Sequence, residues 1–212
     1  MILRNPGRIV AAWVFGLGAS SLVYAAPGPV KVAGDVIGLY QTAARRKYGR
    51  EIYLKVDHSP GTPNAYSSFH GPDGGPQIRI LVSMIEAFRG ETIAATVCHE
   101  LGHFFGDASR GTRDGVLALE SEADYFEGEC LVVYFMKIHG LPERDAEARA
   151  RRTASDEAEA FEGRPIDPRL GLKQTFDGAP TDHPPPECRL LTVMNRIERR
   201  ARPACIEPRD FR

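Results

Sequence analysis

The sequence predicts an α+β fold that is rich in helix. Three short segments are predicted to be strands, at residues 51–57, 65–70 and 77–83, and the first of them alternates polar and apolar residues. Four longer segments have the apolar spacing or the composition of helices, at residues 33–48, 91–106, 117–139 and 142–162. Loops rich in Gly, Pro and Asn separate them. Together these patterns indicate several helices with a small mixed or antiparallel sheet.

The N-terminal elements follow one another with clear breaks. The first helix ends before Gly49, a typical helix stop. The segment 51–57 then alternates as a strand, and a turn rich in Pro, Gly and Asn leads to the strand at 65–70. After a second such loop, residues 77–83 form the clearest strand of the chain. It runs into the helix that begins after Gly90.

Polar and proline-rich loops separate the later helices. Residues 107–116 are predicted to be a polar loop, and the helix at 117–139 is stopped by Gly140. The segment 142–162 is dense in Glu, Arg and Ala, which suits a helix with a charged outer face. Residues 163–186 are rich in Pro and Gly, and we expect a loop that covers a cleft.

Residues 1–25 have the pattern of a secretory signal peptide. Arg4 and Arg8 precede an apolar stretch at residues 9–24, and in the segment 23–25 Val23 and Ala25 offer small side chains before a cleavage site. The apolar stretch is shorter than the roughly 20 residues of a membrane span. We therefore expect a periplasmic or secreted protein, which would touch a membrane only if this segment stayed uncleaved.

Residues 26–212 are long enough for one domain with its own core. This part has a net charge near −3 and no basic patch interleaved with aromatic residues, so nucleic acid is not an expected partner. We expect a monomer.

All four cysteines lie in this part of the chain. An even number in an oxidising compartment favours disulfides. Three pairings are open, and proximity along the chain favours Cys188 with Cys205, which leaves Cys98 with Cys130. No pair has the close spacing of a cysteine zinc site.

The most informative motif is the HExxH sequence of His99, Glu100 and His103. Residues i and i+4 of a helix share a face, so the two imidazoles can bind one metal ion. Glu100 lies beside them, within reach of a water molecule on the metal. Zinc lowers the pKa of such a water from 15.7 to about 7, and a nearby carboxylate can then take its proton. The alternative is a pair of surface histidines on an amphipathic helix.

A catalytic zinc site needs a third protein ligand and leaves the fourth position to water. Ser109 stands where the metzincin pattern has its third ligand, which excludes that pattern. Glu120 and Asp124 are i and i+4 on the next predicted helix, so both can face the first. Glu120 would complete the ligand set, and Asp124 would accept the free N–H of a ligand histidine. Glu122 points about 200° away from Glu120 and is the weaker ligand candidate. The alternative for this pair is an ordinary solvated helix face.

These motifs resemble those of a known family. The HELGH sequence, the E-x-x-A-D-x-F segment at 120–126 and the segment 181–189 are similar to the gluzincin peptidases of metallopeptidase family 48. That family includes the HtpX-type heat-shock peptidases and the CAAX prenyl endopeptidases. The resemblance covers roughly residues 78–200 and is closest to small secreted bacterial members.

The resemblance implies a minigluzincin-like core in which one Zn²⁺ is bound by His99, His103 and Glu120, with Glu100 as general base. It also implies that His183 and Arg189 approach the metal side of the cleft. His183 would donate to the oxyanion or take the fourth metal position. The alternative is that the prolines after His183 only set a turn.

Arg189 would neutralise developing negative charge, or hold Glu120 and Asp124 in place. The function we expect is that of a zinc endopeptidase, with extended polypeptide added to the strand at 77–83. The alternative for that strand is a central position without a free edge. Two other functions stay open: a metal-containing chaperone-like or peptide-binding module of the cell envelope, and a zinc hydrolase that acts on a non-protein amide.

Overall fold

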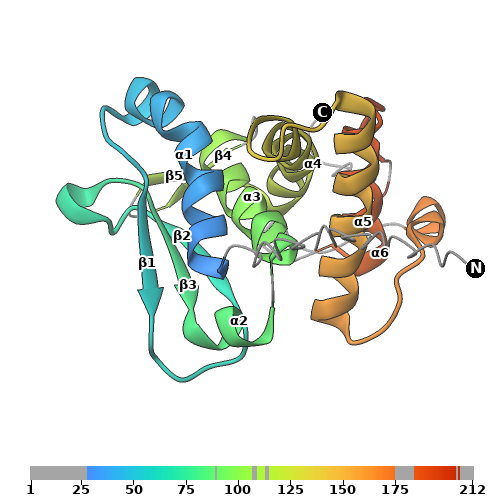
Figure 1. Ribbon diagram of the computed structural model, residues 1–212, viewed down its shortest axis with the longest axis horizontal. Helices are drawn as coiled ribbons and strands as arrows, with labels where there is room; N and C mark the ends of the chain where they lie inside the picture. The colour runs from blue at the N-terminus through green and yellow to red at the C-terminus, as the bar shows by residue number, and fades with distance from the viewer. Residues whose placement is uncertain are drawn as a thin grey trace, which may run out of the picture.

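The computed structural model describes residues 28–88, 90–106, 109–112, 115–174, 184–203 and 205. Within these ranges it is helix-rich with two small sheets, so the α+β prediction is confirmed (Figure 1). The predicted signal peptide, residues 1–25, lies outside the described residues. No helix in the described part is long and apolar enough to cross a membrane.

The larger sheet is mixed, and its strand order differs from the chain order. β1 (Tyr53–Asp57), β2 (Ala65–Ser68) and β3 (Gln77–Leu81) are arranged β1-β3-β2, with β1 parallel and β2 antiparallel to β3. The central strand β3 therefore has both hydrogen-bonding edges occupied. Of the two positions considered for residues 77–83, the structure shows the central one without a free edge, and the strand continues directly into α2 (Val82–Ala87).

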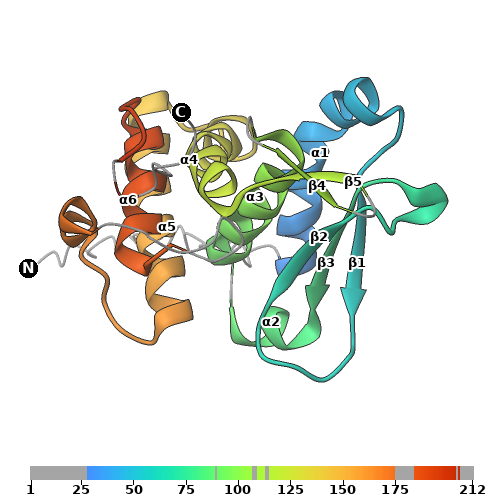
Figure 2. The ribbon, with the colours of Figure 1, turned by 180° about the vertical axis from the view of Figure 1, so that it is seen from behind.

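α3 (Glu91–Phe105) runs through the middle of the molecule. The sheet and α1 (Pro29–Tyr48) lie on one side of it, and α5 (Glu143–Glu162) and α6 (Pro186–Ile197) lie on the other (Figures 1 and 2). α4 (Glu120–Lys137) packs against α3, α5 and α6. Most apolar residues of α3 are almost completely buried, among them Ile93, Ala94, Val97, Leu101 and Phe104. A polar side chain on this helix must therefore find its partners inside the protein.

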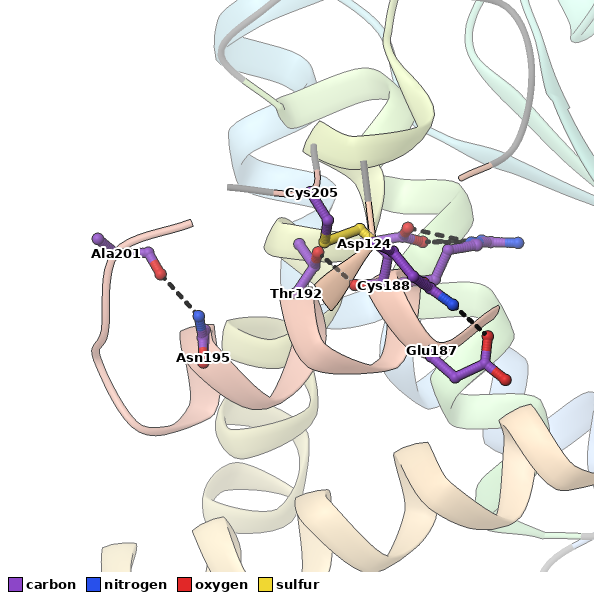
Figure 3. The surroundings of a disulfide bond; sticks show 9 residues. Asp124, Glu187, Cys188, Thr192, Asn195, Ala201 and Cys205 are labelled. Carbon is purple, nitrogen blue, oxygen red and sulfur yellow. Dashed lines mark hydrogen bonds and ion pairs between the residues drawn. A yellow bond between two sulfur atoms is a disulfide. The ribbon is translucent and has the colours of Figure 1, made fainter. Parts of the chain in front are cut away.

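Two disulfides connect the elements around α3. Cys98–Cys130 joins α3 to α4, with Cα atoms 5.5 Å apart. Cys188–Cys205 joins the first turn of α6 to the C-terminal segment (Figure 3). This is the pairing that proximity along the chain favoured, and the structure confirms it.

Several predicted boundaries are wrong. The stretch expected to be a polar loop contains a hairpin of β4 (Ser109–Thr112) and β5 (Gly115–Ala118). Because β5 is extended, α4 begins at Glu120 rather than at residue 117. The proline-rich segment 163–186 contains a 3₁₀ helix, η2 (Pro168–Lys173). A shorter 3₁₀ helix, η1 (Pro72–Gly74), lies in the loop before β3. α6 was not predicted at all.

Candidate metal centre

α3 presents two imidazoles and a carboxylate on the cleft side of the helix. The ring centroids of His99 and His103 are 4.9 Å apart. Donor atoms of these two residues and of Glu100 lie within 4.8 Å of one another. The Glu100 carboxylate is held from the sheet, because Ser67 Oγ on β2 lies 2.6 Å from Glu100 Oε2 and donates to it. The HExxH residues thus form one cluster whose acid is fixed by a neighbouring strand.

α4 brings Glu120 to the same point. Glu120 Oε2 is 3.2 Å from His99 Nε2, and Glu120 Oε1 is 3.6 Å from His103 Nε2. Two ligands that each lie about 2.0–2.1 Å from a tetrahedral zinc ion are about 3.3 Å apart. The two separations from Glu120 are therefore compatible with ligands of one metal ion.

A glycine in the motif permits the close approach of α4. A Cβ atom at Gly102 would lie 2.5 Å from Ala123 Cα and 2.6 Å from the Ala123 carbonyl oxygen. Real Cβ atoms are not found that close to backbone, so only glycine allows α3 and α4 to touch here. Glu120 and Asp124 flank Ala123 on α4 and are carried toward the histidines by this contact.

Asp124 contacts His99 at Nδ1, the ring nitrogen that does not face Glu120. Asp124 Oδ1 lies 3.0 Å from His99 Nδ1, and the carboxylate also binds the Arg189 guanidinium through two bonds, Nη2–Oδ1 at 2.7 Å and Nε–Oδ2 at 3.0 Å. Burial would raise the pKa of Asp124, but the Arg189 charge and the His99 hydrogen bond outweigh it and hold that pKa at about 2. Asp124 therefore stays ionised and fixes the Nδ1–H tautomer of His99.

His99 Nε2 then faces Glu120 with its lone pair. Two acceptors 3.2 Å apart require a cation or a shared proton between them. Without a metal the proton takes that place: burial opposes it, but the hydrogen bonds to Asp124 and Glu120 raise the pKa of His99 well above its ordinary value. The donor set and this arrangement both suit a divalent cation.

A second acidic group adjoins the centre. Glu127, the next residue of α4 on the Asp124 face, has Oε2 3.9 Å from His99 Nδ1. Glu157 on α5 accepts a 2.6 Å hydrogen bond from Thr96 Oγ1 on α3. Burial, followed by repulsion from Glu157, raises the pKa of Glu127 well above its usual value. Burial also raises the pKa of Glu157.

All of these groups line one cleft with a volume of about 470 Å³. Its metal end is formed by α3 and α4, and one wall is the segment that includes β2. The opposite wall comes from α5 and α6, through these residues: Ala154, Glu157, Ala158, Phe161, Glu162, Pro186, Arg189, Leu190 and Val193. The candidate metal centre is thus open to a long ligand.

The structure brings six of the seven predicted site residues together: His99, Glu100, His103, Glu120, Asp124 and Arg189. The seventh, His183, lies outside the described residues. Glu122 is turned away from the centre and pairs with Arg202 at 2.5 Å. The sequence prediction missed Ser67, Thr96, Gly102, Glu127 and Glu157. Of these, Glu127 and Thr96 had a local signal: Glu127 follows Asp124 and Glu120 by three and seven residues, and Thr96 precedes His99 and His103 by three and seven.

Comparison with known proteins does not name a family for this chain. A scan against protein-family models, a search of curated proteins and a search of solved structures each found no match. Function is therefore inferred from the residues and their geometry.

Proposed function

We propose that this protein is a zinc-dependent endopeptidase of the gluzincin type, similar to the peptidases of metallopeptidase family 48. The observation that carries the proposal is the convergence of His99, His103 and Glu120 at the separations of zinc ligands, with Glu100 beside them on an open cleft. Three protein ligands and an open side are typical of catalytic rather than structural zinc sites. The two disulfides are compatible with a periplasmic or secreted protein.

Zinc bound here would acidify a water molecule and polarise the carbonyl group of a peptide bond. Glu100 accepts the proton of the attacking water and delivers it to the departing nitrogen. Ser67 keeps the Glu100 carboxylate oriented for both transfers. Arg189 is a positioning residue in this mechanism, because its guanidinium is occupied by Asp124 and lies 4.0 Å from Glu120 Oε2.

The substrate main chain would add to β2 instead of β3. β2 pairs with β3 on one side, and within the described residues no strand pairs with its other side. Leu81 N donates to Asn64 O, so the alternation of the antiparallel ladder turns the backbone groups of Ala65 and Ser67 outward. Both residues line the cleft, which suits an extended peptide bound by strand addition.

Replacing the general base tests the proposal. Glu100→Gln should retain one zinc ion per chain and lose at least about two orders of magnitude in the rate of cleavage of an unfolded protein substrate. Zinc is measured by elemental analysis and cleavage by the release of new amino termini. Glu86→Gln makes the same charge change at an exposed residue before α3 and should keep full activity.

Two results would contradict the proposal. Undiminished turnover by Glu100→Gln would remove the assigned role of that carboxylate. If the protein binds stoichiometric zinc but shows no chelator-sensitive cleavage of any protein or peptide, a chaperone-like or peptide-binding module is favoured. If it cleaves only a non-protein amide, a zinc hydrolase that acts on such amides is favoured.

A further inference from the structure

The cleft is lined by more acidic side chains than the positive groups of the metal centre can offset. Two positive charges of a zinc ion would offset Glu100 and Glu120, and Arg189 offsets Asp124, which it binds. The remaining acidic residues of the lining are Glu127, Glu157 and Glu162, and the described lining contains no Lys or second Arg to offset them. Acidic side chains without a basic partner in the described lining therefore gather in the part of the cleft between α4 and α5.

Two of these carboxylates reach the cleft from neighbouring helices, Glu127 as a buried side chain and Glu157 as a half-buried one. Glu127 is only 3% exposed, and its Oε1 has no hydrogen-bond partner among the described residues. Glu157 is oriented toward α3 by Thr96. An unpaired buried carboxylate oxygen costs free energy, which a positively charged ligand would recover.

Accepting the proposed peptidase function, we propose that Glu127 and Glu157 form a subsite that binds a lysine or arginine side chain of the polypeptide substrate. The neighbouring wall of Ala154, Ala158 and Phe161 suits the methylene stem of such a side chain, while the two carboxylates meet its charged end.

A bound metal ion fits this place less well. Calcium takes six to eight oxygen ligands, whereas this end of the cleft offers the carboxylates of Glu127 and Glu157, the Thr96 hydroxyl and, within 4.8 Å of Glu127, the Asp124 carboxylate that already binds Arg189. Zinc prefers nitrogen and sulfur donors, and the nearest ring nitrogen, His99 Nδ1, is already hydrogen-bonded to Asp124.

Peptides that differ only in charge test the subsite. Arginine is placed at each position of an extended peptide in turn, and each peptide is compared with one that carries citrulline, which has the same shape without the charge. At one position we expect kcat/KM to favour arginine by about tenfold or more, the scale of a charge-assisted contact. Glu157→Gln can still accept the Thr96 hydrogen bond, and it should reduce this ratio at least about fivefold.

Glu159→Gln is the matched control, because it makes the same change on an exposed face of α5 outside the cleft and should keep the ratio. An arginine-to-citrulline ratio near one at every position in the parent protein, or a ratio that Glu157→Gln does not change, would overturn the proposal. The same peptide pairs are also titrated by fluorescence anisotropy against zinc-loaded Glu100→Gln. If the parent protein cleaves none of the peptides, the peptidase function is refuted. The ratio of the affinities for the arginine and citrulline peptides then still decides whether Glu127 and Glu157 select a cation.

Discussion

Asp124 links two side chains of the site at once. It is 1% exposed, and it binds His99 Nδ1 on one side and the Arg189 guanidinium on the other. A buried carboxylate is tolerated when its charge is paired and its oxygens are hydrogen-bonded, and both conditions hold here. Asp124 would contribute to function by orienting His99 and raising its basicity, because Asp124 binds Nδ1 and leaves Nε2 facing Glu120.

Asp124→Asn should weaken zinc binding. The amide has the same shape but no charge, so it polarises His99 less and leaves Arg189 without its anion. We expect the zinc affinity to fall about 10–100-fold, the usual effect of losing such a partner. Competition with a chromophoric chelator measures the affinity. Asp156→Asn, an exposed change on α5, is the control, and an unchanged affinity in Asp124→Asn would contradict the assigned role.

At this scale the sequence predicts residues related by helical spacing and misses those related by packing. His99, Glu100 and His103 lie within five positions, and Glu120 and Asp124 are one turn apart, so local geometry suffices for each group. Glu157 has no such relation to the motif. It reaches the site only because α5 packs beside α3 and α4, which spacing along the chain does not encode.

The contact between α3 and α4 is the element-scale feature that assembles the site. At Gly102 the two helices approach to backbone contact with Ala123, and Cys98–Cys130 joins the same pair of helices. If α3 and α4 moved apart, Glu120 on α4 would move away from His99 and His103 on α3.

Gly102→Ala should therefore destabilise the protein and weaken zinc binding together. The added methyl group cannot fit 2.5 Å from Ala123 Cα, so α4 must move, at a cost of at least about 2 kcal/mol. Gly38→Ala is the matched control on α1, where a Cβ meets nothing within 4 Å; there the better helix propensity of Ala should stabilise by up to about 1 kcal/mol. Urea unfolding measures the free energy of unfolding of both variants. If Gly102→Ala had the same free energy of unfolding as the parent protein, α3 and α4 would not need the close contact at Gly102.

Elements are predicted less well where tertiary context decides them. Residues 77–83 have a clear strand pattern, but the pattern does not reveal that β1 and β2 take both edges of β3. α6 was missed because Pro184 and Pro185 suggested a loop that continues, although Pro186 stands at a first-turn position that favours proline. The apolar side chains of Leu190, Val193 and Ile197 were the available signal.

At the scale of the whole molecule, the cleft lies between two parts of different character. β2 lies on one side of α3, and α5 and α6 lie on the other (Figure 2). β2 offers the cleft a backbone edge, whereas α5 and α6 line it with side chains. Such a division suits a long, extended ligand, since main-chain hydrogen bonds give affinity for any sequence while the helical wall selects among side chains.

The placement of the two disulfides affects when such a site becomes competent. Cys98 directly precedes His99, and Cys188 directly precedes Arg189, so each crosslink begins one residue from a group of the centre. The chain-entropy model gives about 3–4 kcal/mol for the bridge that spans 32 residues. A newly made chain in a reducing compartment would lack both crosslinks.

We therefore expect the thiol form to bind zinc more weakly than the oxidised form when their affinities are compared by chelator competition, and equal affinities would contradict this. Oxidative maturation would then restrain a destructive activity until the protein has left the compartment in which it was synthesised.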